Sequence, residues 1–98
     1  MIKIETTYDS ENRLTGFTVD NHGSSYVCSA VSMLVINTIN SIETLTNQPF
    51  NCFYNEGGGY ISFALKGRRS SKAGLLLDAM LLGLKSAKEQ YPREVKLN

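Results

Sequence analysis

The chain has few of the residues that build metal centres and disulfide frameworks. Its 98 residues include no tryptophan, one histidine, two prolines and two cysteines, Cys28 and Cys52. No Cys-x-x-Cys pair, no histidine–cysteine cluster and no dense group of carboxylates is present, so we expect no bound metal. The glycine-rich patterns that cradle phosphates are absent as well, and we expect no cofactor.

Charge and long apolar runs are also scarce. Ten Lys and Arg against nine Asp and Glu give a net charge of +1, which argues against nucleic-acid binding driven by the overall field. No apolar run approaches the roughly 18 residues that a membrane span needs, so we expect no such span. The first residues alternate like a strand and do not resemble a signal peptide, so we expect a cytoplasmic protein with reduced thiols. Residues 1–98 form one small domain.

Two pairs of β-prone segments are each interrupted by a turn, which predicts two hairpins. The strands are expected at residues 2–8, 14–19, 52–54 and 60–65. The second turn contains three glycines at 57–59. They provide either a turn with positive φ or a flexible rim that lets a substrate backbone come close.

Two long segments carry apolar residues at helical spacing, and we expect helices from about residue 26 to 46 and from about 72 to 90. The expected buried stripe of the first helix is Val27, Val31, Leu34, Thr38, Ile42 and Leu45. That of the second is Ala73, Leu76, Leu77, Met80, Leu84, Ala87 and Tyr91. Further apolar residues lie outside both stripes, namely Met33, Val35, Ile36, Ile39, Leu75, Leu81 and Leu82. One face of a sheet cannot cover these additional apolar residues as well as the two stripes. We therefore expect a second copy of the chain to cover them in a homodimer.

The expected element order is β-β-α-β-β-α, followed by a short terminal strand near residues 95–97. Antiparallel hairpins and two amphipathic helices predict a two-layer α+β sandwich.

The single histidine shortly precedes one of the two cysteines. Cys28 lies at or near the first turn of the first predicted helix, where free N–H groups and the helix dipole favour a thiolate. His22 is placed to act as its general base. The alternatives are a cysteine buried in the core and a histidine that is a surface or capping residue. Cys52 lies in a β-prone run and is expected to be an inert core residue that ionises less readily.

The residues around this pair carry a family pattern. The pattern begins with His-Gly and a polar loop. It continues with Val-Cys-Ser-Ala-Val-Ser at the start of the first predicted helix. This pattern resembles the ribosomal-processing cysteine proteases, the Prp family of small bacterial proteins. The likeness also includes residues 1–4, 37–43, 57–59 and 89–91, so it covers nearly the whole chain.

The resemblance implies the same α+β fold, a homodimer and a cysteine endopeptidase. Its substrate would be the N-terminal extension of a large-subunit ribosomal protein, cut after an aromatic residue. Tyr26, Phe53 and Tyr54 are apolar candidates to line the substrate groove. Lys66, Arg68, Arg69 and Lys72 form a basic cluster that is either a solvated loop or a contact with ribosomal RNA or an acidic segment.

The resemblance also assigns roles within the site. Cys28 is the nucleophile and His22 the general base, with oxyanion donors expected near Cys28 and Ser29. Ser32 lies one turn beyond Cys28 on the same helix face, and the family motif has a serine there. Its hydroxyl either orients the thiol or the histidine, or bonds back to its own helix.

Three features depart from the family pattern. Asn21 replaces a glycine before the histidine, the acidic residue of the cysteine motif is missing, and the loop between His22 and Cys28 is several residues shorter. These departures support an alternative, in which a catalytically impaired homologue acts as a dimeric peptide- or ribosome-binding protein. For a protease, the segment 21–25 is expected to move so that a peptide can enter.

Overall fold

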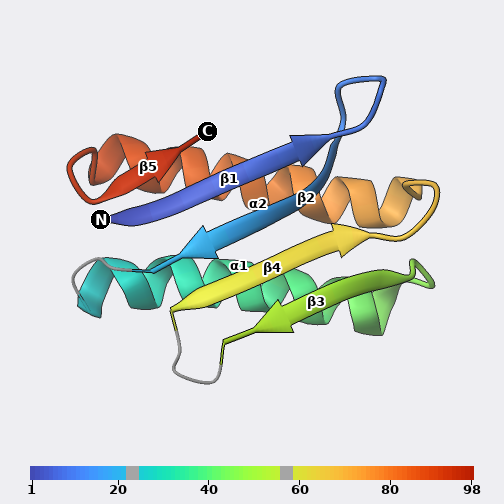
Figure 1. The fold of residues 1–98 in the computed structure, drawn as a ribbon, viewed down its shortest axis with the longest axis horizontal. Helices are drawn as coiled ribbons and strands as arrows, with labels where there is room; N and C mark the ends of the chain where they lie inside the picture. The colour runs from blue at the N-terminus through green and yellow to red at the C-terminus, as the bar shows by residue number, and fades with distance from the viewer. Residues whose placement is uncertain (22–24, 56–58) are drawn as a thin grey trace.

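Five strands and two helices follow one another in the predicted order, β-β-α-β-β-α-β. The computed structural model describes residues 1–21, 25–55 and 59–98. The elements are β1 (Ile2–Tyr8), β2 (Leu14–Asp20), α1 (Ser25–Leu45), β3 (Phe50–Tyr54), β4 (Tyr60–Leu65), α2 (Ser71–Gln90) and β5 (Val95–Leu97). Both helices lie on one face of a single sheet, which confirms the two-layer α+β sandwich (Figure 1).

The sheet has the strand order β3-β4-β2-β1-β5. Both predicted hairpins are antiparallel, and β2 pairs with β4 to join them. The terminal strand β5 pairs in parallel with β1, so the sheet is mixed and not built from antiparallel pairs alone. The direction follows from the path of the chain, because α2 returns the chain to the end of the sheet where β1 begins (Figure 1).

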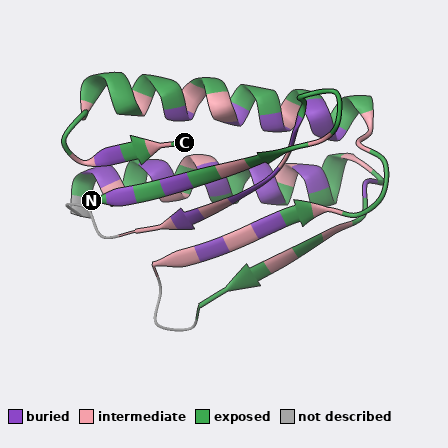
Figure 2. Ribbon diagram, turned by 45° about the horizontal axis from the view of Figure 1, so that its top comes forward, coloured by how far each residue is buried: buried purple, intermediate pink, exposed green. Residues whose placement is uncertain are grey.

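The core lies between the sheet and the two helices, and buried residues recur along the strands and along both helices (Figure 2). On the sheet, the pairing of Val19 with Ile4 and with Ile61 places all three side chains on the face that the helices cover. The hydrophobic core consists of Ile2, Ile4, Leu14, Phe17, Val19, Val27, Val31, Val35, Ile39, Ile42, Ile61, Phe63, Ala73, Leu77, Met80, Leu84 and Val95.

The buried stripe of α1 differs from the predicted one. Val35 and Ile39, which the sequence analysis assigned to the surplus, are core residues, whereas Leu45 is 66% exposed. The buried residues of α1 recur every three or four positions, and this spacing includes Val35 and Ile39. Leu45 is the last residue of α1 and lies beyond the buried part of the helix. Leu34 is only partly buried and packs towards α2, where a Cβ on Gly83 would lie 2.7 Å from the Leu34 Cδ2.

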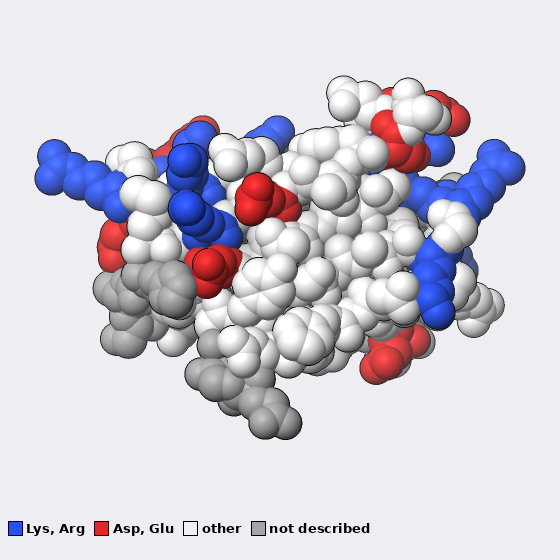
Figure 3. Space-filling model, viewed as in Figure 1, with Lys and Arg blue, Asp and Glu red and all other residues white. Residues whose placement is uncertain are grey.

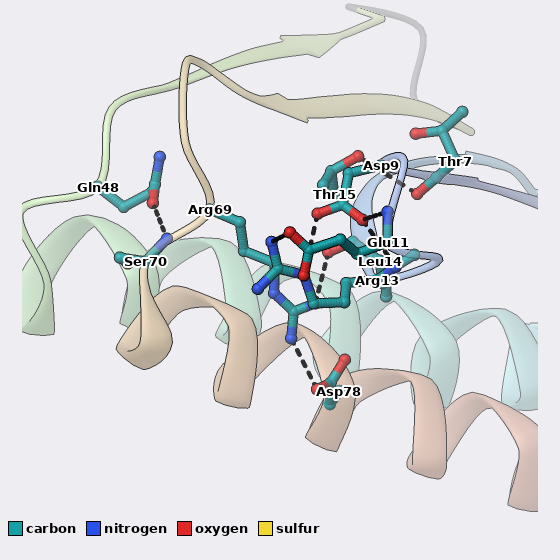
Figure 4. A network of polar contacts seen from close by, with 10 residues as sticks. All are labelled: Thr7, Asp9, Glu11, Arg13, Leu14, Thr15, Gln48, Arg69, Ser70 and Asp78. Carbon is teal, nitrogen blue, oxygen red and sulfur yellow. Dashed lines mark hydrogen bonds and ion pairs between the residues drawn. The ribbon is translucent and has the colours of Figure 1, made fainter.

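The polar network at the start of α2 corrects the interpretation of the basic cluster. Arg69 is not a solvated residue: only 9% of its side chain is exposed, and it donates to the Leu14 carbonyl and to Asp78 (Figure 4). Ser70 is the N-cap of α2, and its side chain accepts from the Ala73 N–H. Gln48 is buried and its Oε1 accepts from the Ser70 N–H.

Some apolar side chains remain exposed on the outer side of the helix layer. Tyr26, Met33, Leu75 and Leu82 are between 69% and 72% exposed. By length and composition alone, the segment Tyr26–Leu45 is apolar enough to cross a membrane, a test that core helices of soluble proteins also pass. The inward stripe accounts for part of this apolar character, and the exposed residues account for the rest.

The opposite face of the sheet is uncovered by helices. Charged side chains gather towards the two ends of this face and leave its middle largely uncharged (Figure 3). The outward residues of β2 and β4 here include Thr18 paired with Ser62.

Candidate active site

Cys28 is the fourth residue of α1, in the first turn of the helix. Its neighbours Val27 and Val31 are core residues and fix the helix against the sheet. Cys28 itself is half-buried and packs against the core, with a free thiol. The prediction of a cysteine in the first turn of a helix is therefore confirmed, and this cysteine packs against the core without being fully buried.

Cys28 lies where the start of α1 presents backbone N–H groups. Free backbone N–H groups and the positive end of the helix dipole gather in the first turn. That turn holds no acidic residue that would compete for them. Ser29 is exposed and follows in the second turn, where its N–H falls within the hydrogen-bond ladder of the helix.

Asn21 links the end of β2 to α1. Its backbone N–H donates to the Gly59 carbonyl at 2.6 Å, and its Nδ2 donates to the Ser32 Oγ at 3.0 Å. The side chain of the residue before His22 thus contacts α1 one turn beyond Cys28.

His22 and the small residues 23–24 lie outside the described residues, and the side chain of Ser25 does too. The distance between His22 and Cys28 therefore remains a prediction, as does the expected movement of this segment. Asn21 was noted in the sequence only as a departure from the family pattern. Its position directly before the histidine was the one signal that could have marked it as a site residue.

The contact of Ser32 bears on one of the two roles considered for its hydroxyl, the bond back to its own helix. In the described part of the chain, this hydroxyl accepts from Asn21, and no bond to its own helix carbonyl is present. Thr38 and Ser86 behave differently, since each donates to the carbonyl four residues earlier. The bond back to the helix is therefore the wrong alternative for Ser32.

The second cysteine lies in a different environment. Cys52 pairs with Phe63 on the helix-facing side of β3 and packs against the core. Burial raises the pKa of the Cys52 thiol, and a hydrogen bond to Tyr54 opposes this only in part. Burial and the same bond raise the pKa of Tyr54 to about 12. Cys52 is thus a poor nucleophile, as expected.

The three aromatic residues considered for the substrate groove lie on three different surfaces. Tyr54 pairs with Ile61 and so shares the helix-facing side of the sheet. Phe53 points to the other side, where its ring centroid is 6.3 Å from that of Tyr60. Tyr26 is on the outer side of α1, with its ring centroid 6.2 Å from that of Tyr91. Of the three, only Tyr54 is on the helix-facing side of the sheet, where it is half-exposed.

No group of three or more His, Cys, Asp and Glu side chains that could hold a metal ion occurs in residues 1–21, 25–55 and 59–98. The chemistry available at the described site is that of a thiol at a helix start, with hydroxyl and carboxamide groups beside it.

Comparison with known proteins agrees with this chemistry. The family model for the cysteine protease Prp matches residues 1–96. The chain belongs to the Prp family. As a member of this family, it is a cysteine protease.

The ribosomal processing cysteine protease Prp of Staphylococcus aureus (strain Mu50) is 27% identical over 104 residues, covering 100% of this chain and 98% of the relative. The crystal structure of S. aureus Prp with a covalently linked product peptide has a TM-score of 0.94 and 28% identity, with coverage of 100% and 98%. The structure of the same protease with a substrate peptide has a TM-score of 0.92 and 26% identity, with the same coverage.

Proposed function

We propose that this protease removes the N-terminal extension of a large-subunit ribosomal protein, with Cys28 as the nucleophile and His22 as the general base. The position of Cys28 supports the proposal most directly, since it is half-buried in the first turn of α1, one turn before Ser32, which Asn21 contacts. The S. aureus relative is named for ribosomal processing and has been seen with substrate and product peptides. We expect the chain to act in the cytoplasm, where its thiols stay reduced.

The reaction begins when His22 takes the proton of the Cys28 thiol and the thiolate attacks the scissile carbonyl carbon. The carbonyl oxygen becomes an oxyanion, which N–H groups of the first turn of α1 stabilise. The imidazolium then gives its proton to the leaving amine, and an acyl-thioester remains on Cys28. His22 next deprotonates a water molecule, which attacks the thioester and releases the acid product and the thiol.

Tyr54 is the aromatic residue best placed to contact the substrate. β3 ends at Tyr54, at the same end of the sheet where α1 begins (Figure 1). Its ring is half-exposed on the helix-facing side of an edge strand. Tyr54→Ala should raise KM by roughly tenfold, because a substrate side chain loses apolar contact area. Phe53→Ala is the matched control, because Phe53 is adjacent to Tyr54 but points away from α1. The KM of the Phe53→Ala variant should equal that of the wild-type protein.

The proposal is tested with a peptide that spans the N-terminal extension and the first mature residues of a ribosomal protein. Mass spectrometry should find one cut, made by the wild-type protein and by Cys52→Ser. Cys28→Ser and His22→Ala should not cleave the peptide. Cleavage by Cys28→Ser, or loss of cleavage in Cys52→Ser with an intact fold, would contradict the assignment of the nucleophile.

The alternative of a catalytically impaired binding protein has one supporting observation. The alignment with the S. aureus relative runs over 104 positions, six more than the 98 residues of this chain. This difference agrees in size with a shorter loop between His22 and Cys28. If the wild-type protein binds the peptide at micromolar concentration but does not cut it, the binding role replaces the endopeptidase role.

We also propose a homodimer formed by the outer side of the helix layer. Tyr26 and Met33 on α1, and Leu75 and Leu82 on α2, are each seven residues apart and form two exposed apolar stripes. The helices run in opposite directions (Figure 1), so this surface can pair with a second copy of itself about a two-fold axis. Light scattering should give a dimer, and Met33→Glu with Leu82→Glu a monomer. A monomeric wild-type protein at micromolar concentration would reject the proposal.

A further inference from the structure

Asn21 is held from both sides at the edge of the site. Asp20, the residue before it, pairs with Tyr60 in the sheet, and the Asn21 N–H donates to the Gly59 carbonyl at 2.6 Å. From this fixed strand end the side chain reaches α1, where Nδ2 donates to the Ser32 Oγ at 3.0 Å. The carboxamide of Asn21 therefore connects the end of β2 to α1 through a hydrogen bond.

The bond from Asn21 determines what the Ser32 hydroxyl can do. A serine hydroxyl donates one hydrogen bond and accepts up to two. Here it accepts from Asn21, and its proton is not taken by a carbonyl of the described residues, unlike the protons of Thr38 and Ser86. Helical side chains lean towards the N-terminus, so the hydroxyl lies over the turn that carries Cys28, four residues earlier.

A second observation argues against a purely structural role for Asn21. Its Oδ1 atom is buried and has no hydrogen-bond partner in the described part of the chain. An unpaired buried acceptor destabilises a fold, and such groups concentrate where function needs a particular geometry. An apolar residue at this position would avoid the unpaired oxygen.

We propose that Asn21 is a positioning residue: it holds the Ser32 hydroxyl so that its proton points to the sulfur of Cys28 and stabilises the thiolate. The inference rests on the proposed function in taking Cys28 as the nucleophile. A hydrogen bond donated to the charged form of a group favours that form. Asn21 therefore acts through Ser32 and does not itself contact the scissile bond.

The test is the rate at which iodoacetamide alkylates Cys28, measured by peptide mapping across pH. Asn21→Ala and Ser32→Ala should each slow alkylation near neutral pH by roughly tenfold, since a hydrogen bond to a charged group is lost. Both should move the midpoint of the pH profile upwards. The double variant should be no slower than Ser32→Ala, because Asn21 acts through that hydroxyl.

Two further variants serve as controls. Ser32→Thr keeps a hydroxyl at the same position and should recover most of the alkylation rate. Ser86→Ala removes a hydroxyl that bonds to its own helix carbonyl on α2, and should leave Cys28 unaffected.

Three outcomes would overturn the proposal: an unchanged pH profile in Asn21→Ala, additive losses in the double variant, or a lower thermal stability of Asn21→Ala without a shift in the profile. Alkylation needs no peptide substrate. If the wild-type protein fails to cut the ribosomal peptide, the proposed function is rejected. The alkylation rates would still test the role of Asn21.

Discussion

The two ends of the sheet satisfy their polar groups in opposite ways. At the end where α2 begins, Gln48 accepts from the Ser70 N–H (Figure 4). It also donates to the carbonyls of Pro49 and Lys66, so that one buried amide joins two loops. At the end where α1 begins, the Asn21 amide donates to Ser32, and its buried oxygen has no partner among the residues that the structure describes.

The same contrast holds for the charged and capping groups. Near Gln48, the guanidinium of Arg69 lies over Gly74 and bonds to the Leu14 carbonyl and Asp78. The cysteine of the site end is half-buried beside the core and its thiol is free. The polar groups of the first end are paired, whereas the other end holds a free thiol and a buried carboxamide oxygen without a partner among the described residues. Substitutions at the two ends should therefore separate activity from stability.

The largest effect is expected for Cys28→Ala at the site end. Removal of a nucleophile lowers the rate of peptide cleavage by about a thousandfold or more. The free energy of unfolding in urea should change by less than about 1 kcal/mol, because only a half-buried sulfur is lost. A large loss of stability would show that this cysteine is a core residue after all, and would remove the contrast between the ends.

The opposite result is expected for Arg69→Ala. The Leu14 carbonyl loses its donor in a largely buried position, and the free energy of unfolding should fall by about 2 kcal/mol with normal peptide cleavage by the folded protein. Gly74→Ala places a Cβ 2.3 Å from the Arg69 Nε and should destabilise by a similar amount. The two losses should not add, since both remove the same contact. Additive losses in urea unfolding would contradict this account.

Two glycines with positive φ provide a sharper comparison. Gly59 has a φ of 91° and a Cβ there would lie 3.3 Å from the Asn21 carbonyl oxygen, whereas Gly67 has a φ of 68° and open space around it. Gly59→Ala and Gly67→Ala should each destabilise by about 1 kcal/mol through backbone strain. Only Gly59→Ala should also reduce kcat, by displacing Asn21. Equal kcat values in both variants would count against a role for Asn21.

The smallest effect concerns the turn at Asp9. The backbone N–H of Arg13, and further bonds from Glu11 and Arg13, lower the pKa of the Asp9 carboxyl below 3.8. Its contribution to stability is therefore present above the unfolded pKa and is lost as pH falls through the lower folded value. Thermal melts should show a slightly steeper acid loss for the wild-type protein than for Asp9→Asn. Identical acid profiles would show that this turn contributes nothing measurable.

The elements and their order could be predicted from the sequence, because period-2 alternation and helical spacing are local patterns. The helix bounds agree to within one residue at Ser25–Leu45 and Ser71–Gln90. The parallel pairing of β5 with β1 could not be predicted, since strand direction depends on where α2 returns the chain. Nor could the burial of Val35 and exposure of Leu45, because an apolar helix does not reveal which side meets the sheet.

The sequence by itself determined the cysteine at a helix start, its neighbouring histidine and the family to which the chain belongs. These features depend on residues that are close in the chain, where capping, dipole and spacing act directly. Only the tertiary structure decided that Asn21 contacts Ser32, that Arg69 is buried and that Tyr54 and Phe53 lie on opposite faces. Such contacts join segments far apart in sequence, and sheet register and helix packing fix them only once the core has formed.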